Sequence, residues 1–306
     1  MMAQAEAAIP AAPTAPLPTE PAGGPQLVSQ RQRALRSFAK NRTAVVGLVL
    51  ILLILLVAVA APLVAPYDPI DQSVQERLDP PSAAHPLGLD DRGRDILSRV
   101  IYGTRIALQV GVFSVLLGGA LGTAIGIVAG YVGGKVESAL MRLTDVLLAF
   151  PDLITGLLVL AVLGPGLWKM IIAIGLTIAP RFARIAYGPT LALKNKEFVE
   201  AARSVGVGSG SILRRHILPN VAGDLLVFAS LWTASAIRLE ASLSFIGLGV
   251  PLPTPTWGQM IREGVVHLSV VPWYSLGPGV ALLLTVLAFN LVGDGFRDAL
   301  DPKSRA

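Results

Sequence analysis

Long apolar runs dominate the pattern of residues along the chain. A helix rises 1.5 Å per residue, so about 20 predominantly apolar residues are needed to cross a hydrocarbon core about 30 Å thick. Six runs meet that length, at roughly 43–66, 106–132, 137–163, 166–187, 222–247 and 273–294. None shows the alternation of a barrel strand. Because only helices and closed barrels satisfy every backbone polar group in lipid, the pattern predicts an all-α integral membrane protein with six transmembrane helices.

Composition and charge place these helices in a membrane and give them a direction. Only 15% of the 306 residues are charged, against about 25% in soluble domains. Most of the 25 lysines and arginines lie before the first run, around the turn after the second, between 181 and 215, and after the last run. Since cytoplasmic loops carry the excess of Lys and Arg, both termini and the 188–220 segment are predicted to be cytoplasmic. The net charge of +5 then reflects topology rather than nucleic-acid binding.

The same pattern divides the chain into four parts. Residues 1–35 are rich in Ala and Pro and predict a disordered cytoplasmic tail. Residues 36–104 hold the first transmembrane helix and an extracytoplasmic segment, 105–296 a five-helix core, and 297–306 a C-terminal tail. Near the end of the extracytoplasmic segment, Ile96, Leu97, Val100 and Ile101 follow an acidic stretch at helical spacing. This predicts a short amphipathic helix at the membrane surface.

Small residues recur every fourth position in the second run. Gly118, Gly122, Gly126 and Gly130 would share one face of a helix. Such a face lets another helix approach closely. The stripe predicts a tight helix–helix contact, either within this chain or with a partner subunit.

Four polar residues inside the apolar runs are candidates for the pore or gate: Arg238, Glu240, Asp145 and Asn290. A charge at bilayer depth is costly, so such residues usually face a bundle interior or a water-filled cavity. Arg238 and Glu240 are two positions apart and would point about 200° from each other on a helix, too far to pair directly. Pairing with another subunit remains an equal alternative to a place on the transport path. Pro151 and Pro180 predict kinks.

The residues needed for catalysis are missing from the sequence. There is no cysteine, no phosphate-binding G-x-x-x-x-G-K-[ST] loop and no H-E-x-x-H motif. His85, His216 and His267 are far apart. We therefore expect no catalytic residue, no metal site and no cofactor on this chain, and any energy for transport must come from an ion gradient or from another chain.

Between the fourth and fifth runs lies a polar segment, EFVEAARSVGVGSGSILRRHILPN, at 197–220. Phe198, Val199, Ala201, Ala202 and Val205 predict a short apolar helix surface. Gly206, Gly208 and Gly210 interrupt it, and SILRRHIL predicts a second short helix that ends at Pro219. A helix, glycine elbow and helix of this kind suits docking in a groove of a soluble partner.

These residues also resemble a known family. Glu200-Ala201-Ala202, Gly206 and Leu218-Pro219 resemble the EAA motif of ABC-importer permeases, the coupling helix that contacts the ATPase. His216 stands where many members have isoleucine, and HILPN is the form in peptide-importer permeases. HPLGLDDRGRDILSRVIYGTRIAL, MRLTDVLLAFPDL, EASLSFIGLGVPLPTPTWGQM and LTVLAFNLVGDGFRDALDP extend the resemblance to C-type permeases of dipeptide and oligopeptide importers, from about Arg36 to Pro302. Arg238 departs from the small or apolar residue usual at its position.

The resemblance implies a type I ABC-importer permease fold in a bacterial inner membrane and a non-catalytic subunit of an ATP-driven peptide importer. The implied partners are a homologous B-type permease, two ABC ATPase subunits that carry ATP and Mg, and an extracytoplasmic peptide-binding protein. The implied ATPase-docking residues, on coupling helices at 197–218, are Phe198, Glu200, Ala201, Ala202, Gly206, His216, Leu218 and Pro219. The alternatives are a gradient-driven secondary transporter, or an ABC permease for a nickel chelate or glutathione.

Overall fold

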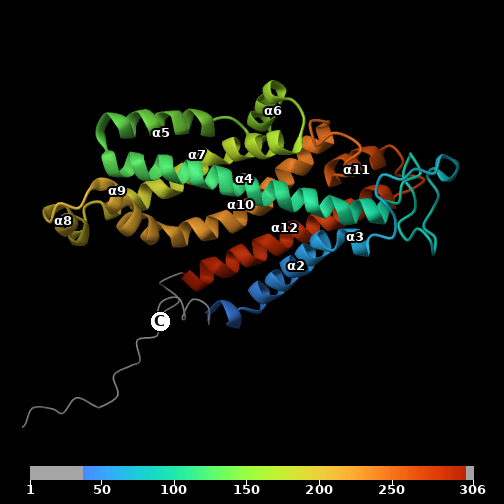
Figure 1. Ribbon diagram of the computed structural model, residues 1–306, viewed down its shortest axis with the longest axis horizontal. Helices are drawn as coiled ribbons and strands as arrows, with labels where there is room; N and C mark the ends of the chain where they lie inside the picture. Colours follow the sequence, from blue (N-terminus) through green and yellow to red (C-terminus); the bar gives the residue numbers. More distant parts are fainter. Residues whose placement is uncertain (1–36, 301–306) are drawn as a thin grey trace, which may run out of the picture.

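A computed structural model describes residues 37–300 of the chain, so the predicted tail at 1–35 lies outside the described residues. The described part is a bundle of long helices that run side by side (Figure 1). In chain order the elements are α2 (Arg42–Val59), α3 (Ala61–Val64), η1 (Val74–Glu76), α4 (Ile96–Val132), α5 (Gly134–Leu148), α6 (Asp152–Leu163), α7 (Leu167–Leu193), α8 (Glu197–Ser204), α9 (Ser209–Ile212), η2 (Leu213–Ile217), α10 (Leu218–Ile246), α11 (Trp257–Val265) and α12 (Trp273–Leu300). Helices α8 and α11 lie at opposite ends of the bundle, which we call the α8 end and the α11 end.

The all-α prediction is confirmed: β-pairing within 37–300 is limited to one isolated bridge between Leu89 and Asp95. Among these residues, five helices are long and apolar enough to cross a membrane. A sixth crossing exists only if α5 and α6, which meet at 97°, count as one broken span. The span predicted at 137–163 with a kink at Pro151 is therefore two helices with a sharp turn between them. Pro151 lacks an N–H group and disfavours helical backbone at Phe150, so the chain turns there.

Helix α4 has 37 residues, about 55 Å at 1.5 Å per residue. It begins ten residues before the predicted span, where the carboxylate of Asp95 accepts a hydrogen bond from the Ser98 backbone N–H at 2.7 Å and caps the helix. The predicted surface helix at 96–101 is wrong, because these residues form the first turns of α4. Ile96 and Arg99 are fully buried, so protein rather than the membrane surface covers this stretch.

The glycine stripe of α4 packs on α7 of the same chain. The facing positions on α7 also advance by four: Gly118 faces Gly175, Gly122 faces Ala179, Gly126 faces Ala183, and Gly130 faces Tyr187 and Thr190. A β-carbon on Gly118, Gly122 or Gly126 would collide with a backbone carbonyl oxygen of α7. Only glycine permits this close approach over about three turns. Because the facing atoms belong to α7 of the same chain, the contact lies within one subunit.

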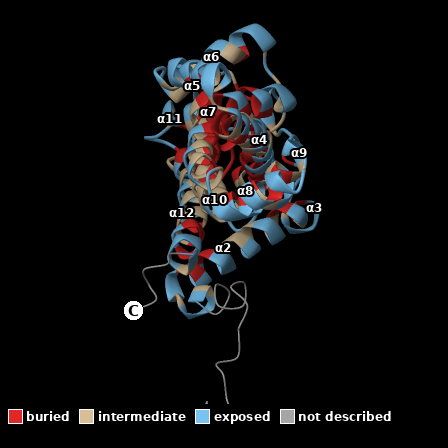
Figure 2. Cartoon of the chain, turned by 90° about the vertical axis from the view of Figure 1, so that its left-hand side faces the viewer, coloured by how far each residue is buried: buried red, intermediate tan, exposed pale blue. Residues whose placement is uncertain are grey.

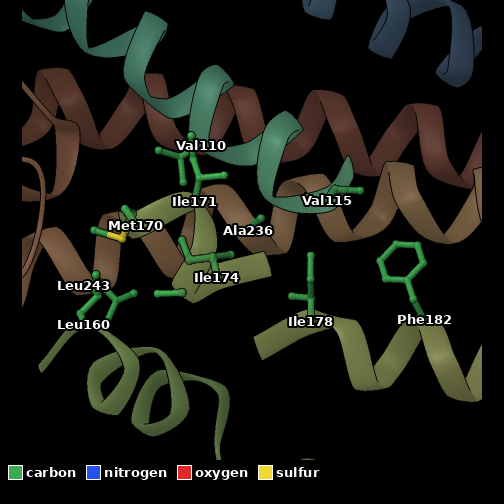
Figure 3. Packing of buried hydrophobic residues seen from close by; sticks show 11 residues of the cluster. Val110, Val115, Leu160, Met170, Ile171, Ile174, Ile178, Phe182, Ala236 and Leu243 are labelled. Carbon is green, nitrogen blue, oxygen red and sulfur yellow. The ribbon is translucent and has the colours of Figure 1, made fainter. Parts of the chain in front are cut away.

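Helix α7 is the centre of the bundle. Its Ile171, Ile174 and Ile178 are buried against residues of α4, α6 and α10 (Figure 3). In the end-on view the buried residues gather around α7 and α4, whereas α2 lies at the edge (Figure 2). In the most apolar window of each helix, 67% of the α7 residues are buried but only 17% of the α2 residues. Helix α2 therefore presents most of its apolar surface to the surroundings.

The two ends of the described chain meet where α2 starts and α12 ends. The Asn41 side chain caps α2 and donates a hydrogen bond to Asp298 at 3.0 Å. Phe38 and Phe296 lie 5.0 Å apart between ring centroids. Helix α12 runs to Leu300, so residues 297–300, which we expected in a C-terminal tail, are helical.

Candidate functional site: the α8 segment and the charged face of α10

Helix α8 ends in a glycine turn whose hydrogen bonds are complete. The Gly206 N–H bonds to the Arg203 carbonyl at 2.9 Å, and the Val207 N–H bonds to the Ala202 carbonyl at 3.0 Å. This pair of bonds is the Schellman motif, which places the residue after the cap in the left-handed region. Gly206 has a φ of +79°, whereas Gly208 has −63°. Of the two glycines compared, Gly206 is therefore the one whose backbone conformation requires glycine.

This difference predicts unequal effects of two matched substitutions. An added β-carbon meets no atom within 4 Å at either glycine, so only the backbone distinguishes them. Gly206→Ala should destabilise the end of α8 by about 1–2 kcal/mol, the cost of left-handed backbone for an L-residue. Gly208→Ala should not. Hydrogen exchange of residues 197–207 measures the effect, and equal exchange in both variants would contradict the assignment.

The apolar residues of α8 occupy two faces rather than the one surface predicted for them. Val199 and Ala202 are buried, in a cluster with Ile212, Ile217 and Val221. Phe198 (42% exposed), Ala201 and Val205 (79% exposed) point outward. Positions 198, 201 and 205 repeat at helical spacing, so the outward residues form a narrow strip. We call Phe198, Ala201 and Val205 the α8 strip.

Aromatic contacts hold α8 on the bundle. The Arg203 guanidinium lies over the Tyr131 ring at the end of α4, 5.0 Å from its centroid. The ring of Phe198 lies 6.2 Å from that of His216 in η2. Glu200 is exposed and, among residues 37–300, forms no ion pair. In Figure 2, which faces the α8 end, α8 is mostly exposed in front of the bundle.

The second helix of the segment does not end at Pro219, contrary to the prediction. Helix runs continuously from Ser209 to Ile246, through a π-helical turn, η2. The Leu218 N–H bonds to the Leu213 carbonyl five residues back. Pro219 lies in the first turn of α10, and this wider turn accommodates its missing N–H group. Leu218 and Pro219 are exposed, and His216 is half-buried.

Three of the four pore candidates differ in their surroundings. Arg238 is exposed and donates a hydrogen bond to Ser235 Oγ at 3.3 Å. Glu240 is buried and accepts a hydrogen bond from the Ser244 hydroxyl at 2.6 Å. Asp145 is exposed and forms an ion pair with Arg184 of α7. Arg238 and Glu240 thus lie on different sides of α10 and do not pair with each other.

The fourth candidate, Asn290, is half-buried on α12. It precedes Arg297 by seven residues, two helical turns, and so lies on the same side of that helix. Asn290 forms no side-chain hydrogen bond within 37–300. The groove that Arg238 lines includes none of the other three candidates.

One side of α10 is hollowed and carries charge. A groove of about 600 Å³ toward the α8 end is lined by residues of α7, α10 and α12, among them Arg184, Asp224 and Arg297. A second groove, of about 390 Å³ toward the α11 end, is lined by Arg238 and by residues of α6, α11 and α12. Asp224, Leu231, Arg238 and Phe245 follow at seven-residue steps, so they share one side of the helix. We call these four residues the charged face of α10.

The opposite side of α10 is apolar. A groove of about 680 Å³ between α4 and α10 is lined by Leu116, Ala120, Ala222 and Leu226, among others. Its one charged lining residue, Arg214, lies at the α8 end. The two sides of α10 therefore offer different environments, one suited to apolar contact and one to polar solutes.

Sequence reasoning missed two ion pairs next to the charged face. Arg181 of α7 binds Asp152 of α6 at 2.5 Å and lies over the Trp232 ring of α10. Arg184 binds Asp145, as described above. The sequence makes Asp145 a pore candidate without indicating its partner, because the paired residues lie 29 and 39 positions apart. Opposite charges inside neighbouring apolar runs are the signal that would have indicated such pairs.

Five helices long and apolar enough to cross a membrane make the described part of the chain a multi-pass membrane protein. Residues 122–306 match the family described as the binding-protein-dependent transport system inner membrane component. Residues 29–81 match the N-terminal TM domain of oligopeptide transport permease C. The chain belongs to the family of binding-protein-dependent transport system inner membrane components.

Relatives and solved structures agree with that assignment. The chain is 45% identical over 269 residues to the glutathione transport system permease protein GsiD of Escherichia coli O6:K15:H31, covering 88% of this chain and 89% of the relative. Its identity to GsiD of Pectobacterium atrosepticum is 43% over 272 residues, covering 89% and 90%. An inward-facing structure of the MetNI methionine ABC transporter shares the fold, with a TM-score of 0.54 and 18% identity, over 66% of this chain and 97% of that chain.

This chain is therefore a permease subunit of an ABC importer and a multi-pass protein of the inner membrane. The sequence-based prediction of that class is confirmed. Permeases of this family are the non-catalytic component of their transporters, and the family implies ATPase, permease and binding-protein partners.

Proposed function

We propose that this chain carries peptides as half of a translocation path and couples to a cytoplasmic ATPase through α8. The other half of the path is a homologous permease, and an extracytoplasmic binding protein delivers the peptide. ATP and Mg would be held by the ATPase subunits. The α8 end would be cytoplasmic, in agreement with the distribution of Lys and Arg.

The α8 strip is the observation that carries the coupling. Phe198, Ala201 and Val205 stay uncovered at the bundle end, on a helix whose other face is firmly anchored. Short apolar residues rimmed by charge suit the groove of a soluble partner. Glu197, Glu200 and Arg203 provide that rim.

The anchored face explains how a push on α8 would reach the path. Val199 and Ala202 pack in one cluster with Ile127 of α4, Ala186 of α7 and Val221 of α10. Packed side chains transmit displacement because interiors are dense and not easily compressed. Movement of α8 by an ATPase would therefore shift the ends of three long helices together.

The relatives favour a peptide as the transported solute. GsiD is named as a glutathione transport permease, and glutathione is itself a small peptide. A match to oligopeptide transport permease C covers the first helix. Peptide is the substrate class that both relatives share, with glutathione as the specific second candidate.

A charge in the α8 strip tests the coupling. Val205→Asp should place a carboxylate within the docking contact, at the C-terminal end of the α8 strip, and lower both ATPase co-purification and ATP-dependent peptide uptake at least tenfold, since an unpaired charge buried at an interface is strongly destabilising. Val132→Asp is the matched control, because Val132 is also exposed, at the nearby end of α4. It should leave assembly intact. Unchanged assembly and uptake in Val205→Asp would refute docking at this strip.

A further inference from the structure

We infer that Arg238 is a carboxylate-binding residue on the translocation path, where it contacts the anionic groups of passing peptides. This inference rests on the proposed peptide transport and adds a specificity-determining residue to it. It starts from the position of the guanidinium in the fold.

Arg238 lies well inside a membrane-spanning helix. It precedes the end of α10 at Ile246 by eight residues, about 12 Å along the helix axis. Its side chain is nevertheless exposed in the isolated subunit. An arginine at that depth does not face lipid; it faces water or a partner protein. The surface around it is therefore covered by a partner or by the aqueous path.

The groove around Arg238 holds no balancing charge. Its other lining residues are Leu153, Ala241, Ser242, Phe245, Ile246, Gly258, Ile261 and Leu282, all uncharged. Among residues 37–300, no carboxylate lies within ion-pair distance of the Arg238 guanidinium. Glu240 is the carboxylate nearest in sequence, and it is buried on the other side of α10 against Ser244.

The neighbouring arginines behave differently, which singles out Arg238. Arg181 and Arg184 of α7 are both paired, with Asp152 and Asp145. Their charge is neutralised within the subunit, whereas that of Arg238 is not. An open guanidinium in an apolar hollow attracts a carboxylate, because its planar donors match both carboxylate oxygens.

The charged face continues from this point toward the α8 end. Ser235, Leu231 and Asp224 precede Arg238 in the sequence and lie on the same side of α10, progressively nearer the α8 end. The groove of about 600 Å³, lined by Asp224 and Arg297 among others, lies on that side. A solute that touches Arg238 would thus meet a hollow that extends toward the opposite end of the bundle. A peptide always carries a terminal carboxylate, and some carry further ones on side chains.

The experiment compares peptides of equal size in the reconstituted importer, with its own binding protein. Uptake of the tripeptides Ala-Glu-Ala and Ala-Lys-Ala is measured in parallel for wild type, Arg238→Lys, Arg238→Gln and Arg238→Glu. Dividing each variant's ratio of the two rates by the wild-type ratio cancels the preference of the binding protein. We expect Arg238→Gln to lower the ratio of glutamyl to lysyl peptide uptake about tenfold, the loss of one charge-assisted contact.

The other two variants test whether the uptake ratio follows the charge at position 238. Arg238→Lys should keep most of the wild-type ratio because it keeps the charge, and Arg238→Glu should lower it further because like charges repel. Arg142→Ala is the matched control, since Arg142 is also exposed and without an ion pair among residues 37–300. It should leave the ratio unchanged.

Assembly of the complex and its ATPase rate without peptide are recorded for every variant. Wild-type importer that moves neither peptide would refute the proposed peptide transport. Uptake of both peptides with the same ratio in the Gln and Glu variants would overturn the assignment of Arg238 while leaving peptide transport standing. Loss of the partner permease from the complex in Arg238→Gln would also overturn it, and would show that Arg238 pairs with a carboxylate of that subunit.

Discussion

Replacement of Gly122 by alanine should separate α4 from α7 and destabilise the whole subunit. The added β-carbon would collide with the Ala179 carbonyl oxygen of α7 and lie 2.7 Å from Phe182 Cβ. A backbone oxygen has no rotamer to which it can move. We expect a loss of about 3 kcal/mol in the free energy of unfolding, at the upper part of the range for overpacked cores. Thermal unfolding of the purified complex measures it.

Two other glycine-to-alanine changes control for helix propensity. Gly188 of α7 meets no atom within 4 Å of an added β-carbon, and at Gly119 of α4 the nearest atom is 3.4 Å away, in Phe182. Alanine favours a helix over glycine by about 1 kcal/mol, so both variants should melt at or slightly above the wild-type temperature. A Gly122→Ala variant that melts with these controls would show that the α4–α7 contact tolerates separation.

The α4–α7 contact could be predicted in part from the spacing of glycines in the sequence. The four-residue repeat of glycine predicts a close helix contact whatever the partner is, because the geometry of a helix fixes which residues share a face. The partner itself depends on tertiary structure. Only the fold shows that Gly175, Ala179 and Ala183 on α7 repeat at the same interval and receive the stripe within this chain.

Hydropathy predicts the ends of helices poorly in two cases: where a helix breaks inside an apolar run, and where a helix extends beyond the apolar run because other parts of the protein bury its polar residues. The 137–163 run contains enough apolar residues for a straight span, yet Pro151 turns the chain by 97° between α5 and α6. Conversely, the charged residues before 106 suggested an exposed segment. Among them, Arg99 lies in the first turn of α4 and is buried, with the Asp90 carboxylate 3.4 Å from its Nε.

The α8 segment shows the same limit on a smaller scale. Its position, its glycine elbow and its apolar residues could be predicted, because Gly206 and the surrounding polarity are local features. Which apolar residues face outward could not, because eight residues span only about two turns and carry apolar side chains on most sides. Val199 and Ala202 are the buried ones because they pack against Ile212, Ile217 and Val221. These three residues belong to elements that follow later in the chain.

The segment 90–99 forms a buried ionic cluster at the α11 end. The Asp90 carboxylate binds Arg94 Nε at 2.6 Å and lies 3.4 Å from Arg99 Nε. Asp90, Arg94 and Arg99 are all fully buried. The cluster extends to Glu263 of α11, which lies 3.5 Å from Arg94 and 2.7 Å from the Tyr274 hydroxyl of α12. It therefore joins the segment before α4 to the last two helices.

Asp90→Asn should destabilise the protein more than any other change proposed above. Asparagine retains an oxygen that can accept the backbone N–H groups of Arg92 and Arg94, which now bond to Asp90 Oδ1 at 2.8 and 3.0 Å. The shape is kept and only the charge is lost, which leaves two buried guanidiniums facing a neutral group. Removing one partner of a buried ion pair costs about 3–5 kcal/mol, and thermal unfolding of the complex should show a correspondingly lower transition.

Asp91→Asn is the matched control, at the next residue and with the same chemical change. The Asp91 side chain is 28% exposed and lies 3.8 Å from Arg94, so solvent screens its charge and its loss should cost less than about 1 kcal/mol. The guanidiniums depend on Asp90 in particular, because Arg94 Nη1 and both Nε and Nη2 of Arg99 are buried without a hydrogen-bond partner among residues 37–300. Equal melting of the two variants would mean that water reaches these nitrogens and that the charge of Asp90 is dispensable.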